Sequence, residues 1–261
     1  MSAMHAIAFI VHVLSQRASQ YFEIRPSNAT ATVGDSVVLQ CKVGNQAQVG
    51  RTQWTKGWFA LGYNYTIPGY SRYRVTGDHS LGEYNLEISN VELSDNDEYE
   101  CQVLPALSDS GVGIRAGAFL TVQVPPRNLT LSPISDRSTH SIRSGSRLSV
   151  NCRTAPAKPA PVIKWYRNGQ EISESHLKQS HQSEADGKLV STQVELNLAA
   201  TSKDDRARFT CAVGHPAVHP ADPALRKEFT LSVSCKFSVP GSLLSKKVWL
   251  CLFGMDQSQG R

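Results

Sequence analysis

Two pairs of cysteines with almost equal spacing constrain the fold of this chain more than any other feature. The first pair lies 60 positions apart and the second 59 apart, and in each pair a tryptophan follows the first cysteine by 13 residues. These positions are Cys41, Trp54 and Cys101 in the first copy and Cys152, Trp165 and Cys211 in the second. The spacing is typical of a two-sheet sandwich in which a disulfide crosses a core about 10 Å thick and the tryptophan packs on the bridge. We therefore predict an all-β chain with the disulfides Cys41–Cys101 and Cys152–Cys211, formed in an oxidising compartment.

Further positions repeat between the two copies. An aspartate lies six residues before the second cysteine and an aromatic residue lies two before it, namely Asp95 and Tyr99 in the first copy and Asp205 and Phe209 in the second. Tyr99 shares the strand parity of Cys101, so we expect its hydroxyl to bond back to the backbone near Asp95 as a tyrosine corner. Phe209 lacks that hydroxyl, which predicts a less rigid turn. Together these signals predict two tandem immunoglobulin-like β-sandwiches.

The domain organisation follows from this frame. Residues 21–124 are predicted to form the first immunoglobulin-like domain, of V or I type, and residues 125–234 the second. Residues 1–20 contain a short apolar run and are predicted to be a signal peptide. The best later apolar run, Val248–Met255, is far shorter than the ~18 residues that a membrane span needs. We expect an extracellular protein, at the cell surface if the chain is a truncated form of a longer membrane protein and secreted otherwise.

Residues 235–261 are too few for a third sandwich and stay unassigned. They contain Cys235 and Cys251. Three interpretations remain open, namely an alternative end of a longer gene product, which we favour, a genuine secreted short form, or a tail that caps the second domain through a Cys235–Cys251 bond.

Charge and motif patterns exclude several classes of function. The 27 basic and 22 acidic residues give a net charge of +5 without a run of Lys or Arg, so nucleic-acid binding is not expected, and a mixed soluble surface is favoured over a polyanion contact. No CxxC pair occurs, and prolines interrupt His215 and His219, the histidines with ligand-like spacing. We predict no catalytic residues, metal, cofactor or small-molecule substrate, and the chain is not expected to be an enzyme.

One face of the first domain has the composition of a protein interface. Because Trp54 and Cys101 point into the core, Gln53 and Thr55 on one strand and Glu100 and Gln102 on its neighbour should point outward. This region combines uncharged polar and apolar residues and is poor in Lys and Glu, as interface centres are. The predicted partner-binding residues are Gln53, Thr55, Trp58, Phe59, Leu61, Pro68, Tyr70, Gln102 and Leu104. The alternative is that they form an ordinary sandwich exterior.

A loop tip and one of three glycosylation sequons lie close to this region. Gly57 in the first position of a two-residue turn suits type II′ and leaves Trp58 at the tip, either as an anchor for a partner or packed on the neighbouring loop. The sequons at Asn28, Asn64 and Asn128 predict N-linked glycans. Asn64 lies close to the predicted face, so a glycan there must project past its rim, or the site is unused.

Several short motifs of the first domain resemble one family. They are Gln53-Trp54-Thr55-Lys56, Phe59-Ala60-Leu61-Gly62, Ile67-Pro68-Gly69-Tyr70 and Tyr99-Glu100-Cys101-Gln102-Val103. They resemble the first domain of the nephrin and irregular-chiasm adhesion proteins, and more closely the nephrin-type arm, which includes nephrin, sticks-and-stones and hibris. The resemblance covers about residues 21–234. It departs at Gly57-Trp58, where the family usually has Asp-Gly, and again after Ser234.

The resemblance implies a function in cell–cell adhesion. Members of the family are cell-surface recognition molecules that bind a counterpart through their first domains. This implies that the CFG sheet of the first domain binds a Neph- or roughest-like immunoglobulin ectodomain, or another copy of itself. The carried-over contact positions are Gln53, Thr55, Phe59, Leu61 and Gln102. The alternative is a soluble immunoglobulin decoy or ligand that modulates a receptor and is not part of an adhesion junction.

Overall fold

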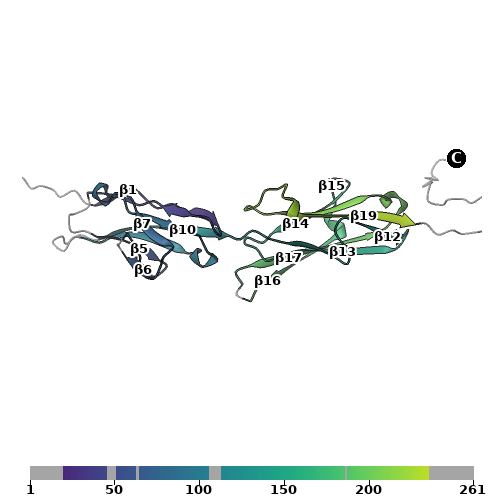
Figure 1. Cartoon of the computed structure of the whole chain (residues 1–261), viewed down its shortest axis with the longest axis horizontal. Coiled ribbons are helices and arrows are strands. Elements are labelled where there is room, and N and C mark those ends of the chain that lie inside the picture. The colour runs from purple at the N-terminus through teal and green to yellow at the C-terminus, as the bar shows by residue number, and fades with distance from the viewer. Residues whose placement is uncertain (1–19, 46–50, 63–64, 106–112, 186, 235–261) are drawn as a thin grey trace, which may run out of the picture. The chain divides into compact units, whose positions relative to one another are not determined.

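The computed structural model describes residues 20–45, 51–62, 65–105, 113–185 and 187–234. The chain divides between Thr121 and Val122 into two compact units, which are described separately (Figure 1). Each unit is a β-structure with one disulfide, so the predicted pair of immunoglobulin-like sandwiches is confirmed. Within the described ranges, no helix is long and apolar enough to cross a membrane. The predicted signal peptide, apart from its last residue, and the tail with Cys235 and Cys251 lie outside these ranges.

The first unit is a sandwich around one disulfide. Its strands are β1 Tyr21–Ile24, β2 Ala29–Thr32, β3 Val37–Leu39, β4 Lys42–Gly44, β5 Thr52–Lys56, β6 Phe59–Gly62, β7 Tyr73–Thr76, β8 Asn85–Ile88, β9 Glu98–Val103 and β10 Ile114–Gln123. A five-stranded sheet has the order β2-β10-β9-β5-β6, and the other sheets are β3-β8-β7 and the pair β1-β4. Cys41, between β3 and β4, is bonded to Cys101 on β9, with Cα atoms 6.5 Å apart. Trp54, Leu86 and Tyr99 are fully buried around this bridge, as the alternation of the sequence predicts.

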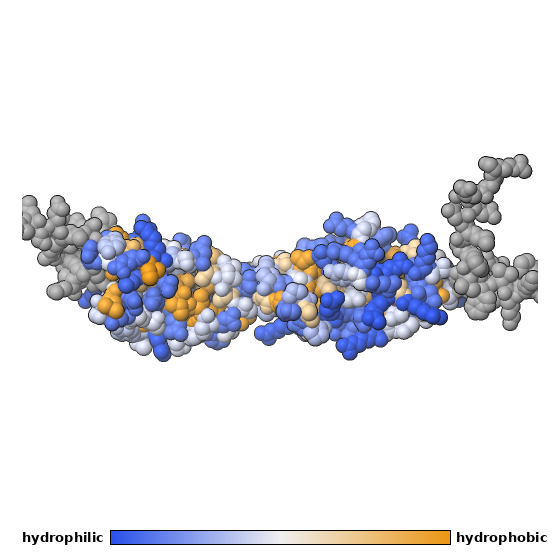
Figure 2. Space-filling model, turned by 90° about the horizontal axis from the view of Figure 1, so that it is seen from above, coloured by the Kyte–Doolittle hydropathy of each residue, from blue (hydrophilic) through white to orange (hydrophobic). Residues whose placement is uncertain are grey.

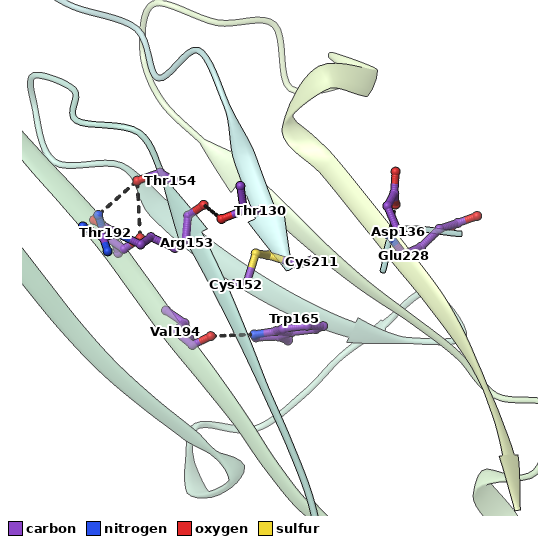
Figure 3. The surroundings of a disulfide bond; sticks show 10 residues. All are labelled: Thr130, Asp136, Cys152, Arg153, Thr154, Trp165, Thr192, Val194, Cys211 and Glu228. Atoms are coloured by element: carbon purple, nitrogen blue, oxygen red, sulfur yellow. Dashed lines mark hydrogen bonds between the residues drawn. A yellow bond between two sulfur atoms is a disulfide. The ribbon is translucent and has the colours of Figure 1, made fainter. Parts of the chain in front are cut away.

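The second unit repeats the plan with two sheets. Its strands are β11 Leu129–Ser132, β12 Ser138–Arg143, β13 Arg147–Thr154, β14 Val162–Arg167, β15 Gln170–Glu171, β16 Leu177–Ser183, β17 Val190–Ala199, β18 Arg208–Gly214 and β19 Arg226–Ser234. The sheets have the orders β11-β13-β17-β16 and β12-β19-β18-β14-β15, and β12 runs parallel to β19. The Cys152–Cys211 bond joins β13 to β18. Beside it the indole nitrogen of Trp165 donates to the carbonyl of Val194 at 3.3 Å (Figure 3).

The turn before the second cysteine is closed by a buried aspartate in the first unit. Asp95 ends the 3-10 turn η2 (Leu93–Asp95), and its side chain accepts the amide of Glu92 at 2.8 Å. The hydroxyl of Tyr99 donates to the Asp95 carbonyl at 3.0 Å. The predicted tyrosine corner is therefore confirmed for this unit.

The second unit differs by one residue at the same turn, so the predicted equivalence of Asp205 with Asp95 is wrong. Asp204, and not Asp205, ends the 3-10 turn η4 (Ser202–Asp204) and is buried. The extra residue is accommodated by Arg206, whose φ is 58°. Asp205 instead accepts the amide of Val233 at 2.9 Å, and the ring of Phe209 is fully buried in the core.

Candidate functional site

The register of the five-stranded sheet determines which side chains of the first unit share its outer face. Along β9, buried residues alternate with residues that point away from the core. Residues directly opposite each other on neighbouring strands lie on the same side of the sheet. By these pairings the outer face consists of Gln53, Thr55, Ala60, Glu98, Glu100, Gln102, Arg115, Gly117 and Phe119.

A chain of polar contacts crosses three strands of the outer face. The amide nitrogen of Gln53 donates to Oε1 of Gln102 at 3.0 Å, and the amide nitrogen of Gln102 donates to Oε2 of Glu100 at 2.5 Å. Arg115 Nε lies 3.8 Å from Oε1 of Glu100. The two hydrogen bonds orient both glutamines before a partner binds. We call these four residues the polar ladder.

One cross-strand row of the outer face carries small side chains on three of its four strands. Gly117 on β10, Thr55 on β5 and Ala60 on β6 are small, Thr55 is only 6% exposed, and Glu100 on β9 is the one large side chain of the row. Thr55 is not the accessible contact that the sequence predicts, because its cross-strand neighbours Ala60 and Glu100 flank it on both sides. The outer face is therefore low on both sides of Glu100, where another flat surface can approach closely.

Phe59 and Leu61 do not belong to the outer face, contrary to the prediction. Phe59 pairs with Lys56, whose amino group lies on the inner side and donates to the hydroxyl of the buried Tyr73 at 3.1 Å. A register shift in the β5–β6 pairing inserts Leu61 as an extra residue, and Leu61 is buried, with 5% exposure. Phe59, Ala60 and Leu61 alternate regularly, and the prediction fails because Phe59 pairs across the turn with Lys56, which points inward.

Three aromatic residues form a separate cluster at the end of the β5–β6 hairpin. Of the two turn residues only Gly57 has a positive φ, 54°, as the predicted type II′ turn requires. Trp58 is 94% exposed, and its ring meets Phe59 edge-on at 6.2 Å. Phe59 in turn contacts Tyr70 at 5.9 Å. We call Trp58, Phe59 and Tyr70 the aromatic edge, and Pro68 lies exposed in the loop that leads to Tyr70.

Two charged residues of the outer face are absent from the predicted site. Glu100 and Arg115 lie in the polar ladder, so the centre of the face is charged, whereas the sequence predicts a centre poor in charge. The alternation that places Gln102 outward also places Glu100 outward, and this signal was available in the sequence. Placing Arg115 on the outer face requires the register between β10 and β9, which cannot be read from the sequence. Leu104, just beyond β9, is 42% exposed and accessible as predicted.

A buried carboxylate anchors β5 beneath this region. Asp95 accepts hydrogen bonds from both terminal nitrogens of Arg72, at 2.6 and 3.0 Å, and from the hydroxyl of Tyr73. The amino group of Lys56, on β5, lies 3.5 Å away. Burial alone would raise the pKa of Asp95, but the hydrogen bonds from Arg72, the Glu92 amide and Tyr73 lower it to about 2. Burial and the bond to Asp95 raise the pKa of Tyr73.

Two of the three predicted glycosylation sites lie in described segments. Asn28 and Asn128 are exposed, which a glycan requires, and Asn64 lies outside the described residues. The side-chain oxygen of Asn28 accepts the backbone amide of Phe119 at 2.8 Å. A glycan on Asn28 would therefore stand beside the rim of the outer face.

The histidines with ligand-like spacing have structural roles. Each accepts the backbone amide two residues further on, His215 from Ala217 at 3.1 Å and His219 from Ala221 at 3.2 Å. In the part of the chain that the structure describes, no group of three His, Cys, Asp or Glu could hold a metal ion.

Comparison with known proteins places both units in one superfamily. Residues 21–104 match a family model described as an immunoglobulin domain, and residues 130–220 match one described as a CD80-like C2-set immunoglobulin domain. A solved structure titled Rst D1-D2 superposes with a TM-score of 0.74 at 28% identity, covering 82% of this chain and 99% of that one.

Sequence relatives narrow the assignment to a family. Human nephrin is 34% identical over 209 residues, 80% of this chain and 16% of nephrin, and human kin of IRRE-like protein 1 is 34% identical over 204 residues, 78% of this chain and 25% of that protein. Synaptogenesis protein syg-1 of Caenorhabditis elegans is 36% identical over 157 residues, 59% of this chain and 20% of that protein. The chain thus spans a quarter or less of these relatives, and the equal identities to the first two favour neither arm of the family. With its two N-terminal-type immunoglobulin domains, the chain belongs to the nephrin and irregular-chiasm family.

Proposed function

We propose that the outer face of the first domain binds the corresponding face of another immunoglobulin ectodomain, of Neph or roughest type or a second copy, and that this contact mediates cell–cell adhesion. The observation that carries the proposal is the polar ladder. Its hydrogen-bonded side chains on β5 and β9 orient one another, so binding would lose less side-chain entropy than on an ordinary polar surface. The relatives, which include nephrin and the kin of IRRE-like proteins, support the same class of function.

The low row across the outer face supports a sheet-against-sheet contact. Two packed sheets lie about 10 Å apart, which demands small side chains where the backbones come closest. Gly117 and Ala60 supply them, next to the shielded Thr55. Gln53 and Gln102 can then donate and accept hydrogen bonds with a partner, while Phe119, 42% exposed, offers apolar area at the rim.

The test is a steric block placed in the low row. Gly117 lies outside the left-handed region, and a Cβ there would meet the movable Oε1 of Glu98 at 3.2 Å, so Gly117→Arg should fold. We expect Gly117→Arg and Gln53→Ala to weaken binding to a Neph-type ectodomain, measured by surface plasmon resonance, by at least about tenfold.

The matched control is Val38→Arg. Val38 is 50% exposed on β3, in the other sheet of the same domain, so the same side chain is added where no contact is proposed. Binding unchanged by Gly117→Arg, or weakened equally by Val38→Arg, would rule out the outer face. Aggregation of beads coated with the chain, mixed with beads coated with the partner, separates adhesion from a decoy that binds without bridging surfaces.

A further inference from the structure

Charge is distributed unequally between the two domains. Residues 21–121 contain 7 Lys and Arg against 11 Asp and Glu, whereas residues 122–234 contain 15 against 10. The modest net charge of the whole chain therefore hides an acidic first domain and a basic second domain. On the face turned to the viewer in Figure 2, the second domain is mostly hydrophilic. A basic domain is an electrostatic attractor for polyanions.

The basic residues converge on one cavity of the second domain. The cavity has a volume of about 710 Å³, within the range of ordinary ligand sites. Five cationic side chains line it, from Arg137, Arg206, Arg208, Arg226 and Lys227. Two carboxylates oppose them, Asp136 and Glu228. The lining therefore carries a net charge of +3, and we call it the basic cleft.

Most of this charge is not neutralised within the protein. Lys227 pairs with Asp136 at 3.2 Å, and the side chain of Arg206, 92% exposed, lies 3.7 Å from a partly exposed carboxylate. Among the described residues, no carboxylate lies within ion-pair distance of Arg137, Arg208 or Arg226. The N–H groups of these three guanidinium groups are thus available in the cleft to donate paired hydrogen bonds to an anion.

Unusual backbone geometry places two of the arginines. Arg137 and Arg206 have φ of 56° and 58°, a conformation that costs about 1 kcal/mol or more for a residue with a Cβ. In the described part of the second domain the third such residue is Asn168, at the ordinary Asn-Gly turn between β14 and β15, and it lines the same cleft. Among the described residues of that domain, every non-glycine residue with this geometry therefore borders the basic cleft.

The sheet positions the others. Arg208 on β18 lies opposite Thr230, and Arg226 on β19 lies opposite Ala212, on the side of the sheet away from the buried Phe209. Thr210 and Asn168 add uncharged hydrogen-bonding groups between the charges. The backbone amide of Glu228 donates a hydrogen bond of 2.9 Å to the side chain of Asp136, and this bond holds the two acidic residues of the cleft together (both residues are drawn in Figure 3).

We propose that the basic cleft binds the sulfate groups of an extracellular sulfated polysaccharide. Separated arginine forks suit several sulfates on one chain, and the hydroxyl and amide groups suit the sugar between them. Single-stranded nucleic acids need aromatic platforms for their bases, and the lining contains no aromatic side chain. The two disulfides belong to the extracellular compartment, where such polysaccharides occur.

The test compares two double variants of the full chain. Arg208→Ala/Arg226→Ala removes two charges from the basic cleft, and Arg147→Ala/Lys178→Ala removes two exposed charges from β13 and β16 in the other sheet. Binding of a heparin octasaccharide is measured by calorimetry at several salt concentrations. We expect the cleft variant to bind at least about tenfold more weakly and to lose about two units of the salt slope, while the control stays within about twofold.

Two further ligands decide the chemistry. The same octasaccharide without its sulfates should not bind, and polyglutamate of equal charge should bind much more weakly, because a carboxylate peptide lacks the sulfate spacing. The proposal is overturned if the two double variants bind alike, if the desulfated sugar or polyglutamate binds as well as heparin, or if the wild type does not bind at physiological salt. Equal thermal midpoints of the two variants confirm that folding is not the cause.

Discussion

Replacing single aspartates in the turns before the second cysteines should separate three residues that the sequence pattern confuses. Asp95 and Asp205 both lie six residues before a cysteine, but the structure makes Asp204 the counterpart of Asp95. The perturbation is aspartate to asparagine at each position, because it removes the charge and keeps the size. The control is built in, since Asp205 is the neighbour of Asp204.

The expected magnitudes follow from the contacts. Asp95 is completely buried and accepts two hydrogen bonds from Arg72, whose side chain is 23% exposed. Asp95→Asn removes the charge of this pair and leaves Arg72 with Glu92 and the Asn90 carbonyl, so we expect a loss of about 3 kcal/mol in the free energy of unfolding. Asp204→Asn breaks an ion pair with Arg167, in which the two side chains lie 2.8 Å apart and the arginine side chain is 39% exposed. We expect the free energy of unfolding to fall by about 1–2 kcal/mol. Asp205 has a 41% exposed side chain and one amide bond that asparagine can also accept, so about 0.5 kcal/mol or less is expected.

Pulsed hydrogen exchange with mass spectrometry along a urea series measures the two domains separately. With a slope of about 1–3 kcal/mol per molar urea, Asp95→Asn should lower the midpoint of the first domain by about 1–3 M and leave the second unchanged. Asp204→Asn should lower only the midpoint of the second domain. The reasoning is refuted if Asp205→Asn destabilises the second domain as much as Asp204→Asn does, or if Asp95→Asn leaves the first domain at its wild-type midpoint.

Three other predictions follow from the same structure. The pKa of Asp95 is lowered from 3.8 to about 2, so the stabilisation by its charged form is present above about pH 4 and is lost as the pH falls towards 2. The total loss is about 2 kcal/mol in the free energy of unfolding. Unfolding measured at a series of acidic pH values should show this loss in the wild type and not in Asp95→Asn. Tyr99→Phe should lower the free energy of unfolding in urea by about 1 kcal/mol, because it removes the hydrogen bond to the Asp95 carbonyl. Phe209→Tyr should also destabilise its domain, by about 1–2 kcal/mol, because it buries a hydroxyl near the Asp204 carbonyl, which already accepts the Ala207 amide. A stabilised Phe209→Tyr would contradict this. Trp58→Ser should change the unfolding free energy by less than about 0.5 kcal/mol, since the side chain is 94% exposed, so any loss of partner binding in the same variant reports a direct contact.

The cysteine–tryptophan frame predicts both sandwiches, because the distance between the two sheets determines how far the disulfide must reach and where the tryptophan can pack on it. The frame cannot detect compensating changes in length between its fixed points. The second domain has one residue more between its buried aspartate and Cys211, yet its cysteines are one position closer together than in the first. Only the left-handed backbone of Arg206 reveals where the residue was added, and Arg carries no sequence signal for that conformation.

Strand parity predicts the outer face correctly where the pairing of two strands is known and fails where it is not. Gln53 and Gln102 lie directly opposite each other and are hydrogen bonded, as the positions of Trp54 and Cys101 imply. On β6 the pairing of Phe59 with the inward Lys56 places Phe59 and Leu61 on the inner side and Ala60 on the outer side, and the sequence does not show this pairing. Parity is a local rule, and only the hydrogen-bond register between strands extends it from one strand to the next.

The charge at the centre of the outer face favours a different partner over a second copy, if the proposed contact forms. A two-fold symmetric contact brings the same patch of both copies together, so Glu98 and Glu100 of one would approach those of the other. Arg115 is 77% exposed and lies 3.8 Å from Glu100, too loosely held to cancel two carboxylates. The acidic excess of the first domain adds repulsion at longer range. A partner that presents a cation opposite Glu100 would convert this penalty into a charge-assisted hydrogen bond, and selection between partners would then depend on that one carboxylate.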